Sequence, residues 1–332
     1  MRPKSIATPG ARAADAHGHR PVLLHPLIES LQPKPGAIAV DGTFGGGGVT
    51  AALLERVLPG GRVIAVDRDP DAVAMGRRRF AQQRDAVTVV QGDFAEIDSI
   101  VESRGVDAAD IVVLDLGLSS IQLDDPNRGF SFLLDGPLDM RMDREQGATA
   151  ADLVNEWSLD DLAAVIRDYG DERWARPIAH AIVRARERAP VTRTAQLREL
   201  VASTVPRRHW PKRIHPATRT FQALRIAVNH ELVSLERGLQ ASIRILRPGG
   251  RLGVISFHSL EDTLVKNSLH VAAQNCVCPP QQPHCTCAHR ATLLLPSRKA
   301  IRPDAGELEQ NPRARSARLR VAEKLDAASG GP

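Results

Sequence analysis

Four short apolar segments, rich in β-branched residues, alternate with helix-like segments in the first third of the chain, and each precedes an acidic residue. The segments and their acids are Ile38–Val40 with Asp41, Arg62–Val66 with Asp67, Val87–Val90 with Asp93, and Ile111–Leu114 with Asp115. This alternation is typical of an α/β fold with a doubly wound, mostly parallel sheet that is buried on both faces. Because the carboxyl ends of parallel strands meet at one edge, we expect the acids to line a ligand site there.

A run of glycines, Gly45 to Gly48, follows the first of these acids and leads into a helical pattern from Val49. Glycine lets the backbone approach a ligand closely, although such runs also form plain turns. A dinucleotide site would place G-x-G-x-x-G directly after the strand, whereas here Asp41 comes before the glycines. The order of acid and glycines favours S-adenosylmethionine as the cofactor, with NAD as the alternative.

The next two acids fit the same cofactor. Asp67 lies 19 residues beyond Gly48, and a carboxylate at that distance suits a ribose diol, because it accepts hydrogen bonds from both hydroxyls. Asp93 or a neighbouring residue is expected near the adenine edge.

The composition limits the class of protein. With 332 residues, 42% of them hydrophobic, the chain can form one large domain or two modest ones. The sequence has no apolar stretch of membrane-spanning length, and residues 1–18 lack the apolar block of a secretory signal. We therefore expect a cytoplasmic protein whose residues 1–18 form a disordered leader.

A helical insertion is expected after the fourth strand. A cap at Ser158 predicts a helix that stops at Gly170, and further helical patterns cover residues 174–188 and 194–205. A long helix over 217–246 and a strand over 251–257 then resume the α/β pattern, with late strands near 291–295 and 317–321. The discontinuous sheet domain would thus comprise 19–125 and 215–332, and the insertion 126–214.

Part of the expected insertion lies in a strongly basic stretch of the chain. Residues 171–225 contain twelve Arg and one Lys against four acids, although the net charge of the whole chain is only +5. Such a surface predicts a polyanionic substrate, so the insertion is interpreted as the domain that recognises the substrate. A solvated, salt-bridged helical face is the alternative.

The four cysteines form two C-x-C pairs, Cys276 with Cys278 and Cys285 with Cys287. Paired thiolates across a Pro-rich turn are plausible zinc ligands, but the spacing departs from the commoner C-x-x-C. Disulfides are less expected in a reducing cytoplasm, and four free cysteines are the other alternative. No metal is predicted for the active site.

Several longer strings together resemble one family, the RsmH (MraW) methyltransferases, which use S-adenosylmethionine to modify bacterial small-subunit ribosomal RNA. The strings span most of the chain. They are 19–24, 41–45, 67–70, 115–125, 128–132, 137–143, 215–223, 255–262 and 311–316.

The resemblance implies a Rossmann-like class I methyltransferase domain that methylates the N4 amino group of a decoding-centre (P-site) cytidine in 16S rRNA of the small ribosomal subunit. It implies cofactor contacts at Gly47, Gly48, Val49, Asp67, Phe94, Asp115 and Gln122. At Val49 the family usually has histidine, so only a backbone contact is expected there. The resemblance leaves a homodimer open.

The N4 lone pair of cytosine is delocalised, so the site needs a hydrogen-bond acceptor for the reacting amine. Asp115 and His258 are the candidates, with Ser256 and Asn229 as weaker ones; a cofactor contact and a structural histidine are the respective alternatives. Planar groups are also needed to hold the base. The choices are Phe130, Phe132, Trp157, Trp174 and Trp210, although each is individually more typical of a core.

Two other functions fit the same sequence features. A methyltransferase for another nucleic acid or for protein would keep the cofactor loop and use the basic insertion differently. A ribosome-assembly factor that binds cofactor and RNA without turnover is the non-enzymatic alternative.

Overall fold

The computed structural model describes residues 21–279, 281–282 and 284–326, so the expected leader at 1–18 lies outside the described residues. The chain divides into two compact units. The first comprises the chain up to Gly117 and again from Ser234 onward, and the second is Leu118–Val233. Each unit is described by itself.

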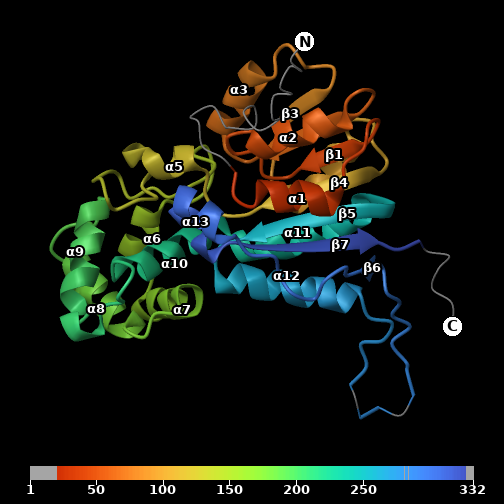
Figure 1. The fold of residues 1–332 in the computed structure, drawn as a ribbon. Coiled ribbons are helices and arrows are strands. Elements are labelled where there is room, and N and C mark those ends of the chain that lie inside the picture. Colours follow the sequence, from red (N-terminus) through yellow and green to blue (C-terminus); the bar gives the residue numbers. More distant parts are fainter. Residues whose placement is uncertain (1–20, 280, 283, 327–332) are drawn as a thin grey trace. The chain divides into compact units, whose positions relative to one another are not determined.

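The first unit contains a seven-stranded sheet in the order β3-β2-β1-β4-β5-β7-β6 (Figure 1). Its strands are β1 (Ile38–Asp41), β2 (Arg62–Asp67), β3 (Val87–Gln91), β4 (Ala109–Asp115), β5 (Leu246–Ser256), β6 (Leu293–Leu294) and β7 (Arg318–Lys324). The first five strands pair in parallel, and β7 runs antiparallel to both of its neighbours. The prediction of a doubly wound, mostly parallel sheet is confirmed, including its two late strands.

Helices cover both faces of this sheet. Successive strand residues point to opposite sides, and because both sets are apolar, each face must be covered. Along β1, Ala39 belongs to one hydrophobic core and Val40 to the other. The first core contains buried residues of α1 (Leu24–Leu31), α2 (Gly48–Val57) and α3 (Pro70–Arg79). The second contains those of α4 (Ile97–Glu102), α11 (Glu231–Ile245) and α12 (Ser259–Ala272). Two short elements, η1 (Phe94–Glu96) and α13 (Ala305–Gln310), and the turn η4 (Pro312–Ser316) complete the unit.

The expected long helix over 217–246 is wrong, because the structure has two helices there. The first, α10 (Ala217–Asn229), ends at His230, which adopts a left-handed conformation with φ of 51°. The second helix is α11. Leu246, the expected last residue of the single predicted helix, is the first residue of β5. A non-glycine residue in this conformation interrupts the helical hydrogen bonds, and nothing in the apolar pattern of the sequence indicates it.

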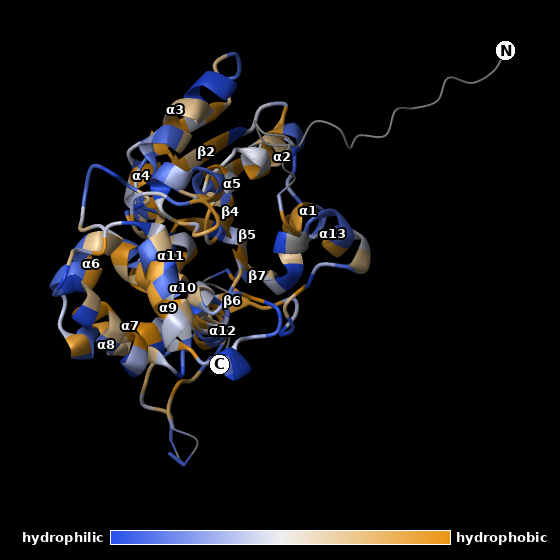
Figure 2. Ribbon diagram, turned by 90° about the vertical axis from the view of Figure 1, so that its left-hand side faces the viewer, coloured by the Kyte–Doolittle hydropathy of each residue, from blue (hydrophilic) through white to orange (hydrophobic). Residues whose placement is uncertain are grey.

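The second unit is helical. Its elements are α5 (Ser120–Asp124), η2 (Pro126–Arg128), α6 (Ala150–Glu156), α7 (Leu159–Gly170), α8 (Ala175–Arg186), α9 (Thr194–Thr204), η3 (Arg207–His209) and α10. Their apolar sides share one core, and in Figure 2 hydrophobic and hydrophilic stretches alternate along α7 and α8, as helices with one buried side require. Ser158 caps α7 and the helix ends at Gly170, both as expected, and the next residue, Asp171, is left-handed.

The second unit extends beyond the expected insertion at 126–214 on both sides. The reason at its carboxyl end is α10, whose Phe221 and Leu224 are buried in the core of this unit. Gly170 allows α10 to approach α7 closely, since a Cβ on Gly170 would lie 2.7 Å from the Arg219 carbonyl oxygen. Sequence periodicity assigns α10 to a helix but does not indicate which core it joins.

Candidate active site at the carboxyl ends of the strands

The glycine run forms the loop between β1 and the start of α2. Gly47 is the residue before α2 and has φ of 76°, a conformation that side-chain-bearing residues rarely adopt. A Cβ there would also lie 2.6 Å from the Phe44 ring. The first N–H groups of α2, from Gly48 and Val49, have no carbonyl partner within the helix and are therefore available to a ligand.

The side chain of Val49 is buried in the core that includes α1 and α2. It therefore offers only its backbone N–H to a ligand, as expected from the sequence. The role of Gly47, Gly48 and Val49 in cofactor binding stays a prediction.

The Asp41 side chain holds this loop in place by hydrogen bonds. Its carboxylate is fully buried and accepts hydrogen bonds from the Thr50 hydroxyl at 2.7 Å and from the Thr43 N–H at 3.2 Å. Burial raises its pKa to about 6, and these hydrogen bonds oppose the shift. Asp41 thus joins the end of β1 to the first turn of α2.

Asp67, at the end of β2, is oriented by two backbone groups. Its Oδ2 accepts from the Gly45 N–H at 2.7 Å, and its Oδ1 accepts from the Asp69 N–H at 2.9 Å. Desolvation raises its pKa to about 6, although part of the residue remains exposed. Since each carboxylate oxygen has a second lone pair, the group can still accept two hydroxyl hydrogen bonds.

Phe94 and Asp93 follow β3. The Phe94 ring packs against α11, where a Cβ on Gly238 would lie 2.3 Å from the ring. The Asp93 carboxylate accepts from the Ala95 N–H and from the Ser234 hydroxyl, both at 2.9 Å, and pairs with Arg68 at 3.2 Å. Asp93 therefore stabilises this corner, and the partly exposed Phe94 is the better candidate for an adenine contact.

Asp115, at the end of β4, differs from the other carboxylates. Its N–H donates to the Thr43 hydroxyl at 2.6 Å, which ties β4 to the loop after β1. Its Oδ1 is buried and accepts no hydrogen bond from any described residue. Burial, followed by the negative charges of Asp41 and Glu261, raises its pKa to about 8. A buried acceptor without a partner is rare in proteins and often marks a functional position.

His258 follows β5 and caps α12. Its Nδ1 accepts from the Glu261 N–H at 3.4 Å, so the neutral ring carries its proton on Nε2. Nε2 lies 3.0 Å from Glu261 Oε1 but without hydrogen-bond geometry, so the two atoms form a close polar contact only. The buried Glu261 in turn accepts from the N–H groups of Phe257 and His258. His258 therefore has a structural role whether or not it also acts in catalysis.

Two weaker candidates are also occupied by structural contacts. Ser256 is buried, and its hydroxyl lies 3.5 Å from the Arg318 carbonyl oxygen. Asn229 belongs to the second unit and is described below. Glu261 was missed as a single residue by sequence reasoning, although it lies inside the matched string at 255–262. Its position three residues after His258, the cap of α12, could have indicated Glu261 as part of a capping box.

The first unit therefore combines a doubly wound sheet, a glycine loop at the start of a helix and three carboxyl groups with raised pKa at one sheet edge. The carboxyl oxygens of this edge are hydrogen-bond acceptors for the hydroxyl groups of a nucleoside cofactor, and the Gly47 turn leaves room for close backbone contact. These features define a class I methyltransferase that uses S-adenosylmethionine.

The chain belongs to the MraW methylase family, whose model matches residues 16–325. It is 51% identical over 308 residues to the Ribosomal RNA small subunit methyltransferase H of Geobacter sulfurreducens, covering 92% of this chain and 99% of that protein. The protein of the same name from Trichlorobacter lovleyi is 48% identical over 307 residues, covering 92% and 98%. A solved rRNA methylase structure from Streptococcus thermophilus aligns with a TM-score of 0.39 and 11% identity, covering 91% of this chain and 94% of that one.

Gln122 lies in the second unit, at the start of α5. Its backbone N–H donates to the Ser119 hydroxyl at 3.2 Å, and its side-chain oxygen accepts from the Ser119 N–H at 3.1 Å. This reciprocal pair fixes the side chain at the helix start. The predicted cofactor contact of Gln122 is not tested by these bonds.

The candidate base-stacking aromatics all lie in the second unit. Phe130 is buried, and Trp157 packs at the edge of the core. The Phe132 ring is 5.1 Å from His215, and the Trp210 ring is 5.5 Å from the same histidine. Arg207 lies over Trp210 at 4.5 Å from the ring centre. Trp210 is therefore the aromatic most closely associated with positive charge, which its position beside Arg207 and Arg208 in the sequence could have indicated.

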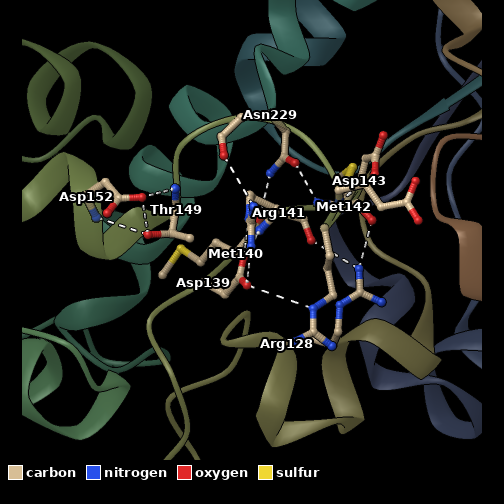
Figure 3. Close-up of polar contacts among 12 residues, drawn as sticks. Arg128, Asp139, Met140, Arg141, Met142, Asp143, Thr149, Asp152 and Asn229 are labelled. Carbon is tan, nitrogen blue, oxygen red and sulfur yellow. Dashed lines mark hydrogen bonds and ion pairs between the residues drawn. The ribbon is translucent and has the colours of Figure 1, made fainter.

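The matched strings at 128–132 and 137–143 form an irregular segment that polar contacts hold in place (Figure 3). The buried Arg128 donates to the carbonyl oxygens of Arg141 and Met142, at 3.1 and 2.9 Å. Arg141 forms a two-point ion pair with Asp139, at 2.8 and 3.0 Å. Figure 3 shows these residues converging with Asn229 of α10 on the same stretch of backbone.

Asn229 uses both ends of its amide in this segment. Its Oδ1 accepts from the Met142 N–H, and its Nδ2 donates to the Met140 carbonyl, both at 2.8 Å. Met140 is buried and left-handed, with φ of 64°, so its backbone conformation depends on such support. Asn229 therefore holds this backbone segment in its conformation. These contacts explain the presence of an asparagine here without a catalytic role.

We expect Asn229→Ala to lower the free energy of unfolding by about 2 to 4 kcal/mol, because it leaves a buried N–H and a buried carbonyl without partners. Urea unfolding followed by circular dichroism measures the effect. Gln222→Ala, which removes a single bond to the Tyr169 carbonyl from the same helix, is the control and should cost about 1 kcal/mol. Equal effects of both substitutions on the free energy of unfolding would contradict this structural role of Asn229.

Loss of the Asp67 carboxylate should weaken cofactor binding. We expect Asp67→Ala to raise the Kd for S-adenosylmethionine about 10- to 150-fold, equivalent to the roughly 1.5 to 3 kcal/mol of charge-assisted hydrogen bonds. Calorimetry measures the change, with the exposed Asp85→Asn of the same unit as control. Asp67→Asn separates this loss from loop damage, because it retains an acceptor oxygen. An unchanged Kd in Asp67→Ala would exclude Asp67 from the cofactor site.

Proposed function

We propose that this methyltransferase transfers the methyl group of S-adenosylmethionine to the N4 amino group of a decoding-centre cytidine in 16S rRNA, in the cytoplasm. The relatives named Ribosomal RNA small subunit methyltransferase H support small-subunit rRNA as the substrate. The choice of N4 and of the cytidine comes from the sequence resemblance. The observation that carries the chemistry is the buried, unpartnered Oδ1 of Asp115 among the described residues.

The proposed reaction needs more help for the acceptor than for the donor. Bound S-adenosylmethionine supplies a methyl group on a positively charged sulfur, which is already a good leaving group. The N–H groups at the start of α2 and the Asp67 carboxylate would hold and orient the cofactor. The residues of the chain must then make the amino nitrogen a better nucleophile.

Asp115 is suited to that task in its ionised form. A carboxylate oxygen that accepts a hydrogen bond from the amino group favours the pyramidal nitrogen and stabilises the positive charge that develops on this nitrogen as the new bond forms. The buried Oδ1 has no competing donor among the described residues, so the amino group would not have to displace one. After transfer the proton leaves the nitrogen, and a group with a pKa raised to about 8 can accept it.

The second unit supports binding of a polyanion. Exposed cations that form no ion pair within the described chain occur on α8, just after its end, and on the segment that follows α9. They are Arg184, Arg188, Arg207, Arg208, Lys212 and Arg213. By contrast, Arg186 donates to the Val154 carbonyl at 2.8 Å and is a structural residue. Residues 207–213, with four cations around Trp210, combine phosphate-binding charge with a stacking surface.

The part of the chain that the structure describes contains no helix long and apolar enough to cross a membrane. The structure contains one chain, so the homodimer stays a prediction.

Methylation of purified small subunits tests the proposal. The wild-type chain, incubated with small subunits that lack the modification and with isotopically labelled S-adenosylmethionine, should place the label on N4 of one decoding-centre cytidine. Nuclease digestion and mass spectrometry locate the label. Label on a carbon atom, on another RNA or on ribosomal protein would contradict the proposal, and so would stoichiometric cofactor binding with no transfer.

A further inference from the structure

A long segment joins α12 to β6 and projects from the sheet unit (Figure 1). Its described residues between Ala272 and Leu293 form no helix or strand. At its base the Thr292 N–H donates to the Ala272 carbonyl at 2.8 Å, and the Ala291 N–H donates to Asn275 Oδ1 at 3.1 Å. Connections of this length without regular structure are uncommon in compact domains and are usually functional segments or linkers.

The four cysteines of the chain lie on the two limbs of this segment. Cys276 and Cys278 are on the outgoing limb, and Cys285 and Cys287 are on the returning limb. Together they are called the cysteine cluster. Their sulfur atoms all lie within 4.8 Å of one another. The segment thus folds so that residues about ten positions apart meet at one point.

Two of the sulfur separations match those of a tetrahedral metal site, and the others are no longer than 4.8 Å. Zinc binds thiolates at about 2.3 Å, so two sulfurs of a tetrahedral site lie about 3.8 Å apart. Cys285 Sγ is 3.6 Å from Cys287 Sγ, and Cys287 Sγ is 3.9 Å from Cys276 Sγ. A disulfide requires about 2.05 Å, and all four cysteines are free in this structure. The cluster also leaves too little room for several iron atoms with bridging sulfides, so a single ion fits best.

Backbone N–H groups point at two of the sulfurs. The Val277 N–H donates to Cys287 Sγ, and the Cys278 N–H donates to Cys276 Sγ, each at 3.4 Å. Such bonds stabilise thiolates and orient metal ligands from outside the coordination shell. One of them crosses between the limbs and one stays within the outgoing limb, so the backbone is already arranged around both pairs.

We propose that the cysteine cluster binds one zinc ion and that this ion fastens the two limbs of the projecting segment. The site has four thiolate ligands and no open position, which is the arrangement of a structural zinc and not of a catalytic one. The ion supplies the cross-link that the few hydrogen bonds at the base of the segment do not provide. The methyl-transfer site requires nothing from it.

Metal analysis of the full chain tests the proposal. The chain is purified without a polyhistidine tag or chelator from zinc-containing medium, and metals are measured by mass spectrometry of the acid digest. We expect about one zinc per chain, which a thiol-reactive mercurial releases. In the double variant Cys278→Ser, Cys287→Ser we expect less than a tenth of that zinc, whereas Val277→Ala, a neighbouring exposed residue without a ligand atom, should retain it all.

The second measurement is limited proteolysis. The double variant should be cut between residues 273 and 292 at least tenfold faster than the wild type, and its Kd for S-adenosylmethionine should stay within twofold. Less than about 0.1 zinc per freshly purified wild-type chain would overturn the proposal, and this result does not depend on how any variant folds. Bound iron in place of zinc, or disulfides found by alkylation and mass spectrometry of the unreduced chain, would overturn it as well.

Discussion

Asp115→Asn is expected to lower kcat for RNA methylation about 10²- to 10³-fold, with the Kd for S-adenosylmethionine changed less than about threefold. Asparagine has nearly the same shape, but it cannot carry the negative charge that stabilises the reacting amine. Methylation at saturating cofactor, together with calorimetry, separates the two effects. The exposed Asp107→Asn in the same unit is the matched control and should match the wild type in both.

The opposite pattern would exclude the catalytic role. If Asp115→Asn weakens cofactor binding and leaves kcat at saturation unchanged, Asp115 contacts only the cofactor. If neither quantity changes, the unpartnered oxygen has no function in the reaction.

The same carboxyl group predicts a pH dependence. Its pKa is raised from 3.8 to about 8, so the folded chain favours the protonated form. The stabilisation from this group is therefore complete below about pH 4 and is lost as pH rises through about 8. We expect the thermal stability of the cofactor-free wild type to fall from pH 6 to 9 relative to Asp115→Asn. Parallel curves would contradict the assignment.

Activity should change with pH in the other direction. Because the ionised carboxylate is the acceptor, kcat/KM for S-adenosylmethionine should rise as pH increases from 6 to 8.5, since this quantity reports ionisations of the free enzyme. The residual activity of Asp115→Asn should lack this rise.

Removal of the four cations around Trp210 should have the second large effect. In the variant with Arg207, Arg208, Lys212 and Arg213 all replaced by Gln, we expect RNA affinity to fall about 10²- to 10³-fold at 0.1 M salt. The slope of log K against log salt should decrease by about 3, because each lost phosphate contact contributes roughly 0.7 to 0.9. Filter binding at several salt concentrations measures both, and cofactor affinity should not change.

A control with equally exposed arginines separates phosphate contacts from general charge. Arg167 and Arg176 are exposed in the same unit but pair with Asp168 and Asp160. Replacing both with Gln should leave the salt slope within about 0.5 of the wild type. An unaltered slope in the fourfold variant would mean that residues 207–213 do not contact RNA.

The sheet and its ligand edge could be predicted from the sequence because both follow from local patterns. Apolar runs buried on both faces, each followed by an acid, specify parallel strands and the edge where their carboxyl ends meet. The confirmed strands β1, β2 and β4 end at Asp41, Asp67 and Asp115 as expected. The glycine run could be assigned to the loop between β1 and α2, because it directly follows the first strand and precedes a helical pattern.

What the sequence did not indicate depends on tertiary contacts. The division of the helix at His230 rests on a left-handed residue, and the membership of α10 in the second unit rests on its approach to Gly170. The difference between Asp41 and Asp115 was also hidden, since both are acids after strands. Only the neighbours distinguish them: Thr50 satisfies the first, and no described residue satisfies Oδ1 of the second.

The central claim is that this chain methylates N4 of a decoding-centre cytidine through Asp115. Mass spectrometry of 16S rRNA from cells lacking the gene, complemented with the wild type or with Asp115→Asn, tests it most directly. We expect the N4-methyl group to be absent without the gene, to return with the wild type and to stay largely absent with Asp115→Asn at equal protein level. An N4-methyl group that persists in cells without the gene would contradict the account.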